Sequence, residues 1–303
     1  MPDFLRARRN RRHPLRDLAF HLLDLASYEA AYLAGPARRD LFFNSGFLPL
    51  AEDFRPLPGH EAEDHAAMMY HFVGLTHPAE AGVSMAPRRI LDIGCGPGGG
   101  LLYLSSRHPR AALCGTERAA AARRLARRLL PQARILPAGA PLDGRFDLVT
   151  GVGTPTYIGL AAFLAQVAPL LAPGGVISIS GGYRQGRHDA IRQELTSAAD
   201  VQGLVLASYR DIAAHTLAAL QADLPRREAS VARLPRPLRR YARRWADLPG
   251  TPEHDDYLRG QRADFAAVFT HAAASDHPRN LSSQASAERS APAPSRQARA
   301  EAR

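Results

Sequence analysis

The residues best suited to chemistry form a glycine-rich segment at the end of a short predicted strand. Residues 92–98 read Asp-Ile-Gly-Cys-Gly-Pro-Gly, and residues 88–93 have the pattern of a strand. Glycine adopts positive φ freely and has no side chain to collide with a ligand, so these glycines let a strand turn into a helix beside a bound molecule. The segment also fits the GxGxxG pattern at Gly94, Gly96 and Gly99, which is typical of dinucleotide sites.

Two carboxylates indicate which class of ligand the glycine-rich segment would bind. Asp92 stands two residues before the first glycine, where its charge would repel a pyrophosphate and attract a cationic ligand such as S-adenosylmethionine (SAM), directly or through water. Glu117 follows 25 positions later, at the end of the second predicted strand, where a carboxylate can accept both hydroxyls of an unphosphorylated ribose. The alternatives are a plain tight turn for the glycines and an ordinary helix N-terminal acid for Glu117. Taken together, the glycines and the two acids favour a SAM site.

The elements that must position this site follow from the hydrophobic periodicity. Strands are expected at 88–93, 111–116, 133–137, 146–152, 176–180, 204–207 and 263–270. Helices are expected at 13–34, 61–76, 99–107, 118–130 and 159–171, and on both sides of strand 204–207 within 189–223. Strands and helices that alternate in this way predict an α/β fold with βαβ units, right-handed crossovers and a mainly parallel sheet.

The chain divides into five predicted parts. A helical N-terminal cap (1–85) precedes the α/β core (86–223), an arginine- and proline-rich lid (224–262) follows, and 263–273 supply the last core strand. Residues 274–303 have almost no large apolar side chain, so they cannot bury enough surface to offset the entropy of ordering. We therefore expect a disordered tail.

Four segments carry a resemblance to a known family. Residues 89–98, 114–117, 146–149 and 170–175 resemble the first, second, fourth-strand and fifth-strand motifs of class I SAM-dependent methyltransferases. The resemblance extends over roughly 40–270 and implies the Rossmann-like, seven-stranded fold of that superfamily, with the lid inserted before the last strand. The chain looks most similar to small-molecule enzymes of the phthiotriol or fatty-acid O-methyltransferase kind. Those carry an Asn-x-Gly-aromatic loop, matched at 44–47, and an Asp-Ile-Thr-type segment, loosely matched at 211–213.

The resemblance implies a set of cofactor-binding residues. By this resemblance, Asp92 and the glycines surround the methionine part of SAM, and Glu117 holds its ribose. Phe47 helps to close the pocket, and the backbone at 151–153 lies beside the methyl donor. The complete implied set is Phe47, Asp92, Ile93, Gly94, Cys95, Gly96, Gly98, Glu117, Arg118, Gly139 and Val152. Relatives often place an acid after the third strand, but residues 137–140 contain none, so adenine recognition would fall to backbone groups.

A general base is not evident from the sequence. Relatives of the phthiotriol kind tend to place a histidine just after the fourth strand, and Thr156, which cannot act as a base, occupies that position here. Methyl transfer needs mainly alignment of nucleophile and methyl group, so an acceptor that ionises readily would need little help. Otherwise the base would come from elsewhere, the candidates being Tyr157, Tyr183, His188 and His215.

Three functions are compatible with these features. The first is a SAM-dependent methyltransferase that O- or C-methylates a small molecule, in specialised or lipid metabolism. The second, motivated by the missing acid and histidine, is a SAM-fold protein that does non-methylating chemistry or binds SAM structurally. The third is a nucleic-acid methyltransferase or binding module, against which the absence of an Asn/Asp-Pro-Pro-aromatic run after the fourth strand argues.

Composition narrows the classes of protein further. The chain has 303 residues and a formal net charge of +10, with arginine but no lysine. The arginines are spread along the chain, and no nucleic-acid-binding motif accompanies them. This favours a general bias in composition over a surface that binds nucleic-acid phosphates. Two cysteines and no metal-ligand spacing argue against a disulfide scaffold and a metal site. No apolar run is long enough for a membrane span, so a cytoplasmic location is expected. The acceptor and the oligomeric state cannot be inferred from the sequence.

Overall fold

The strands predicted from the sequence form one seven-stranded sheet in the order β3-β2-β1-β4-β5-β7-β6. The strands are β1 (Arg89–Ile93), β2 (Ala112–Glu117), β3 (Arg134–Pro137), β4 (Phe146–Val152), β5 (Leu171–Tyr183), β6 (Leu204–Asp211) and β7 (Ala263–His271). Strands β1 to β5 are parallel to one another, while β7 runs antiparallel to both β5 and β6. The Rossmann-like fold class is thereby confirmed.

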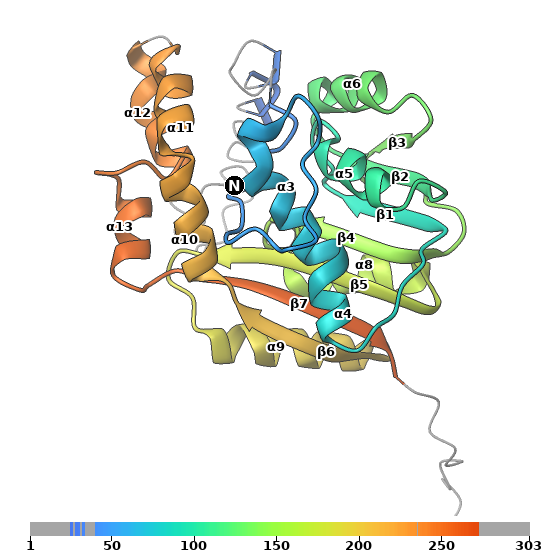
Figure 1. The fold of residues 1–303 in the computed structure, drawn as a ribbon. Helices are drawn as coiled ribbons and strands as arrows, with labels where there is room; N and C mark the ends of the chain where they lie inside the picture. The colour runs from blue at the N-terminus through green and yellow to red at the C-terminus, as the bar shows by residue number, and fades with distance from the viewer. Residues whose placement is uncertain (1–24, 27, 31, 34–39, 235, 273–303) are drawn as a thin grey trace, which may run out of the picture. The chain divides into compact units, whose positions relative to one another are not determined.

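The computed structural model describes residues 25–26, 28–30, 32–33, 40–234 and 236–272. Helices connect the strands (Figure 1). They are η2 (Glu61–Glu63), α3 (Asp64–His71), the π-helix η3 (Phe72–Thr76), α4 (His77–Glu80), α5 (Gly99–Arg107), α6 (Ala120–Leu129), α7 (Pro155–Ile158), α8 (Leu160–Val167), η4 (Ala168–Leu170), α9 (His188–Val201), α10 (Ala213–Ala222), α11 (Leu224–Ala232), α12 (Arg236–Trp245) and α13 (Pro252–Leu258).

Several boundaries differ from the sequence-based prediction for local reasons. β5 is longer than the expected 176–180 because antiparallel β7 pairs with it as far as Tyr183. The helix expected at 159–171 is α8 followed by η4, and Gly159, with a φ of 101°, separates α8 from the short α7 before it. The lid contains three helices, and Pro225 lies at the start of α11, where a missing N–H is tolerated.

The sheet has a hydrophobic core on each face because successive strand residues point in opposite directions. Ile90, Leu148 and Val268 pack with α3, η3 and α5 on one face. Leu91, Val149 and Phe269 pack with α8 and α9 on the other face. This alternation fixes the strand register, and with it the edge where the carboxyl ends of β1, β2 and β4 lie together.

The predicted cap and lid are continuous with the core. The described residues between 25 and 33 are helical, and α10–α13 lie together at one end of the sheet in Figure 1. All of these belong to one compact unit that ends at His271, so the boundaries between cap, core and lid stay predictions. The rest of the helix expected at 13–34 and the tail expected at 274–303 lie outside the described residues.

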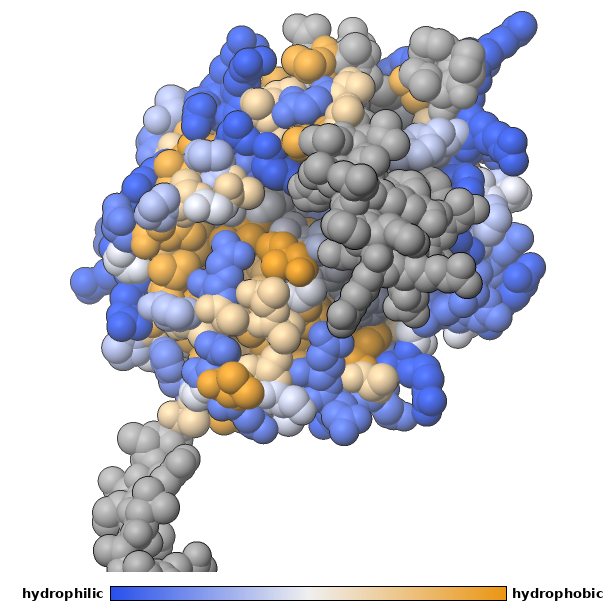
Figure 2. Space-filling model, turned by 180° about the vertical axis from the view of Figure 1, so that it is seen from behind, coloured by the Kyte–Doolittle hydropathy of each residue, from blue (hydrophilic) through white to orange (hydrophobic). Residues whose placement is uncertain are grey.

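On the face seen in Figure 2, hydrophilic residues dominate the outline and hydrophobic residues gather toward the middle. In the described part of the chain, no helix combines the length and apolar character needed to cross a membrane.

Candidate cofactor and substrate site

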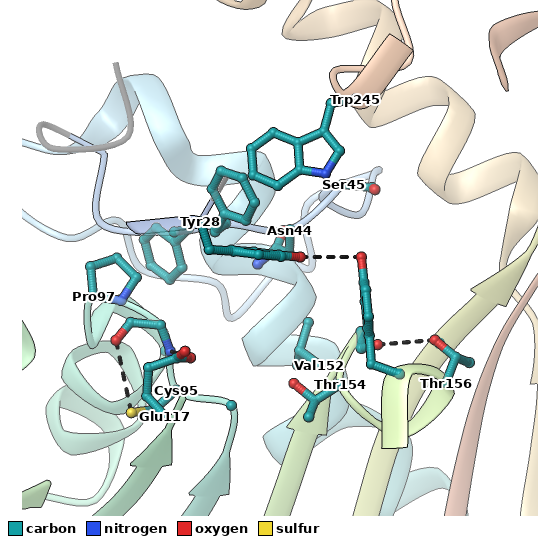
Figure 3. Close-up of a pocket in the computed structure, with 18 of the residues that line it drawn as sticks. Tyr28, Asn44, Ser45, Cys95, Pro97, Glu117, Val152, Thr154, Thr156 and Trp245 are labelled. Atoms are coloured by element: carbon teal, nitrogen blue, oxygen red, sulfur yellow. Dashed lines mark hydrogen bonds between the residues drawn. The ribbon is translucent and has the colours of Figure 1, made fainter. Parts of the chain in front are cut away.

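A cavity of about 1380 Å³ opens at the carboxyl ends of the parallel strands. The glycine loop after β1, the end of β2 and the segment after β4 form its floor. Figure 3 shows Glu117, Cys95 and Val152 beside these strand ends, with Tyr28 and Trp245 on the opposite side of the space. In open α/β sheets, ligands bind at this edge.

The glycine loop has the geometry expected of a close backbone approach. Gly94, Gly96 and Gly98 have φ of 79°, 54° and 99°. The N–H groups of Gly94 and Cys95 both donate to the carbonyl of Thr116, at 2.7 and 3.0 Å, which ties the loop to β2. A Cβ on Gly94 would lie 1.9 Å from Thr154 Oγ1, whereas one on Gly96 would meet only Tyr32 Oη, at 3.5 Å. The space beside Gly96 is therefore open toward the cavity.

Asp92 is completely buried behind this loop. Its carboxylate accepts hydrogen bonds from Thr150 Oγ1 at 2.9 Å and Tyr70 Oη at 3.1 Å. Burial raises the pKa of Asp92 to about 7, the two hydrogen bonds oppose the shift, and nearby Glu117 adds to it. Tyr70 lines the cavity and Asp92 does not, so the hydrogen bond from Tyr70 links Asp92 to the cavity. The sequence analysis left a direct and a water-mediated contact between Asp92 and the ligand open, and the contact stays a prediction.

Glu117 lines the cavity and is itself buried. One carboxylate oxygen accepts from the N–H of Gly96 at 3.1 Å and the other from the N–H of Ala119 at 2.8 Å. Burial raises the pKa of Glu117, while these backbone hydrogen bonds lower it. Each oxygen keeps a further lone pair, so the carboxylate can accept from two ligand hydroxyls. The N-terminus of α6 is satisfied by Glu29, which accepts from the N–H groups of Ala120 and Ala121.

An aromatic cluster covers the cavity. Tyr28 from the N-terminal segment, Phe43 from the following loop and Trp245 from α12 pack with ring centroids 4.5–5.8 Å apart. The guanidinium of Arg118 lies 4.6 Å from the Tyr28 ring centroid, a cation–π geometry. Tyr28 Oη donates to Tyr157 Oη at 3.2 Å, as the dashed line in Figure 3 marks. Three distant parts of the sequence thus meet over the site.

Most of the implied cofactor residues line the cavity, and three do not. Those that line it are Ile93, Gly94, Cys95, Gly96, Glu117, Arg118, Gly139 and Val152. Gly98 instead packs against α6, where an added Cβ would lie 3.2 Å from Ala126. Asp92 and Phe47 are also absent from the lining. After the third strand, Ala138, Gly139 and Ala140 bring backbone groups to the cavity, as the absence of an acid there led us to expect.

Phe47 does not help to close the pocket. The side-chain oxygen of Asn44 accepts from the N–H of Gly46 at 2.8 Å, and this turn directs Phe47 into the core. There its ring stacks between Phe72 and His215, with centroids 4.3 and 4.4 Å away. The same loop supplies Phe43 to the cavity, a residue that the sequence motif gave no reason to choose.

Of the four candidate bases, only Tyr157 lines the cavity. Tyr183 stacks on Phe265 outside it. His188 is held by Tyr209, whose Oη is 2.7 Å from Nδ1. His215 stacks on Phe47, and its Nδ1 lies 2.7 Å from the carbonyl of Leu48. Thr156 lines the cavity but donates to the carbonyl of Gly153 at 3.0 Å, so it stabilises the turn after β4.

The lid contributes a network of charges that the sequence did not indicate. Arg244 pairs with Glu253 at 2.6 Å, and Arg262 pairs with Asp264 at 3.2 Å. Tyr257 Oη also donates to Asp264 at 2.6 Å. Several members of this network line the cavity, and so do Arg226 and Arg227 of α11. Among the residues that the structure describes, no group of His, Cys, Asp and Glu side chains could hold a metal ion.

Comparison with known proteins agrees with this geometry. Residues 90–175 match the model of a methyltransferase domain. A trans-aconitate 2-methyltransferase from Variovorax paradoxus is 33% identical over 113 residues, which are 34% of this chain and 44% of that protein. A second one, from Rhodopseudomonas palustris, is 33% identical over 31% of this chain and 38% of its own length. The chain thus spans less than half of these curated relatives.

Solved structures match over a much longer stretch. A geranyl diphosphate C-methyltransferase from Streptomyces coelicolor, in complex with Mg²⁺, geranyl diphosphate and S-adenosylhomocysteine, has a TM-score of 0.57 and 16% identity, covering 82% of this chain and 97% of that one. A cyclopropane synthase from Mycobacterium tuberculosis has a TM-score of 0.60 and 13% identity, covering 81% and 97%. These likenesses show the fold. Together with the methyltransferase-domain match over residues 90–175, they support a class I SAM-dependent methyltransferase.

Proposed function

We propose that this protein binds SAM at the glycine loop and transfers its methyl group to a small acceptor with a largely apolar body. The observation that carries the proposal is the pair of buried carboxylates, Asp92 and Glu117, beside an open glycine backbone at the ends of adjacent strands. A buried carboxylate is unfavourable unless a positive charge or hydrogen-bond donors compensate it.

The two carboxylates fit the two polar ends of SAM. No ion pair to Asp92 is formed within the described residues, and its hydrogen-bond partners there are the neutral Tyr70 and Thr150. A ligand cation near Tyr70 would therefore stabilise the ionised carboxylate. Glu117 offers one free lone pair on each oxygen to a pair of ribose hydroxyls. A pyrophosphate in the same place would face two acids.

The cavity leaves room for a second molecule. Its volume of about 1380 Å³ exceeds the roughly 300–1000 Å³ of a typical small-molecule site. Beyond the strand ends, its lining is rich in apolar side chains, among them Ile158, Val231, Leu234 and Trp245. An acceptor with an apolar body fits this compartment, because burying such a body against these side chains is favourable.

The residues of the chain contribute alignment and exclusion of water. Bound SAM supplies a methyl group on a positively charged sulfur, which is already activated for displacement by a nucleophile. The aromatic cluster of Tyr28, Phe43 and Trp245 would keep bulk water from the acceptor, and the turn after β4 would hold the acceptor side of the methyl group.

Release of S-adenosylhomocysteine tests the proposal. The protein should form it from SAM in the presence of apolar acceptors, and a variant with Glu117→Gln should form it more slowly. SAM binding without turnover across a broad set of alcohols, phenols, carboxylic acids and activated carbons would instead favour a protein that holds SAM without methylating.

A further inference from the structure

A single aspartate of the lid has a backbone conformation that normally belongs to glycine. Asp247 has a φ of 49°, the one positive φ outside glycine among the described residues. It lies just after α12, where its N–H donates to the carbonyl of Arg244 at 3.3 Å and the N–H of Leu248 donates to the carbonyl of Arg243 at 3.0 Å. These two bonds form the Schellman motif that ends many helices, and glycine is the usual residue at the left-handed position.

Neither the turn nor the helix explains an acid at this position. A side chain at a left-handed position is less favourable than glycine, although aspartate tolerates it better than most residues. A negative charge at the carboxyl end of a helix is also unfavourable, because the helix dipole favours cations there. The side chain of Asp247 is therefore retained despite two local penalties. Such an outlier in a cavity is a sign of function.

Within the part of the chain that the structure describes, the carboxylate of Asp247 is left without a partner. Asp247 lines the cavity, and among the described residues neither a hydrogen bond nor an ion pair to its carboxylate is formed. The charged groups that face it are Arg262, Arg227 on α11, Asp264 on β7 and Glu253 on α13. Burial raises the pKa of Asp247 to about 6; the two arginines lower it, and the two acids raise it further.

The arginines that face Asp247 are already engaged. Arg262 pairs with Asp264 at 3.2 Å, and Arg227 pairs with Asp223 at 2.8 Å. The carboxylate is thus ionised near neutral pH, and its position in the cavity leaves it accessible to a ligand.

Asp247 lies in the part of the cavity where the methyl acceptor is proposed to bind. Asp264, which faces it, pairs with Gly182 across β5 and β7, and residues 180–182 also line the cavity. The N–H of Gly153, after β4, donates to the carbonyl of Ser180 at 2.9 Å. Asp247 thus lies on the side of the cavity where β4 and β5 end and β7 begins, next to the turn proposed to hold the acceptor.

Resting on the proposed function, we propose that Asp247 is the proton acceptor for a neutral hydroxyl of the methyl acceptor, so that this enzyme O-methylates an apolar alcohol or phenol. The hydroxyl oxygen forms the bond to the methyl carbon, the electron pair of the carbon–sulfur bond stays on sulfur, and the hydroxyl proton passes to a carboxylate oxygen of Asp247. Removal of a proton by a positioned base contributes about 10²–10⁴-fold to a rate. A polyanionic acceptor is disfavoured, since it would face an unpaired carboxylate.

Three ligands with the same octylphenyl group test the contact between an acceptor hydroxyl and the carboxylate of Asp247. They are para-octylphenol, para-octylanisole, which lacks the proton, and para-octylbenzoate, which carries a negative charge. In the presence of S-adenosylhomocysteine, the wild type should bind the phenol about tenfold more tightly than the anisole, the worth of one hydrogen bond to a charged group, and should bind the benzoate weakly. Asp247→Gly should remove the preference for the phenol. Asp247→Asn should lower the rate of phenol methylation at least about 10²-fold.

Stability and SAM affinity show whether the role is structural. Both variants should bind SAM like the wild type and keep or raise its Tm, and Asp255→Asn, which alters a half-buried acid of the same lid, should change none of these quantities. A Tm lower by more than about 4 °C in Asp247→Gly would assign a structural role to the residue and overturn the inference. Equal binding of phenol and benzoate, or no binding of any probe, would overturn it as well. Failure of the wild type to bind SAM would instead overturn the proposed function.

Discussion

Asp92→Asn is expected to stabilise the ligand-free protein. The carboxylate is completely buried, and burial raises its pKa from 3.8 to about 7. An acid with a higher pKa in the folded state favours folding when it is protonated. This stabilisation is complete below about pH 4 and is lost as the pH rises toward 7. At 1.36 kcal/mol per pKa unit, the loss is about 4 kcal/mol at pH 7.5. Asparagine has the same shape and can bond to both Tyr70 and Thr150 without a charge.

Urea unfolding between pH 5 and 8 measures this effect. The difference in unfolding free energy between Asp92→Asn and the wild type should grow with pH and level off above pH 7. Asp143→Asn, which alters an exposed carboxylate, serves as the control because no such trend is expected there. A variant that is equally destabilised at every pH would refute the reasoning, because Asp92 would then act through its hydrogen bonds alone.

The same substitution should weaken SAM binding. At pH 6 about 90% of Asp92 is protonated in the free wild type, and a cationic ligand favours the ionised form. The SAM affinity of the wild type should therefore rise by up to about tenfold between pH 6 and 8, and that of Asp92→Asn should stay constant. Calorimetric titrations at several pH values test this. Identical affinities and pH dependences for the two proteins would show that the charge of Asp92 does not contribute to SAM binding.

Three further substitutions probe other parts of the site. Glu117→Gln should weaken SAM binding by about tenfold in calorimetry and should discriminate less against 2′-deoxy-SAM, because a charged acceptor of the ribose hydroxyls is lost; unchanged discrimination would argue against that contact. Gly94→Ala should lower the Tm or leave the protein insoluble, because the added Cβ lies 1.9 Å from Thr154 Oγ1 at a φ of 79°; a wild-type melting curve would show that the loop can rearrange. Trp245→Ala should raise the KM for an apolar acceptor while SAM affinity stays unchanged, because Trp245 covers the cavity from the lid; a matching loss of SAM affinity would assign Trp245 to the cofactor.

The sequence predicted the core of the fold because its signals are local. The helix at 99–107 and the strand at 146–152 have the predicted bounds, since hydrophobic periodicity and glycine turns determine them. The end of β5 was predicted too early because its last residues are ordered by β7, a partner about 80 positions away that periodicity cannot reveal.

The floor of the site could be predicted, but its cover could not. The glycine loop and Glu117 follow from residues close together in sequence, and both line the cavity. Tyr28, Phe43 and Trp245 meet only in three dimensions, and no periodic pattern links them. Phe47 was assigned to the pocket from a loop motif, yet a turn two residues earlier directs it into the core.

Calorimetric titration of the wild-type protein with SAM and with NAD at pH 7.5 tests the central claim most directly. SAM should bind with a micromolar or lower Kd, and NAD, whose pyrophosphate would face Asp92 and Glu117, should give no measurable heat of binding. Binding of NAD without binding of SAM would contradict it.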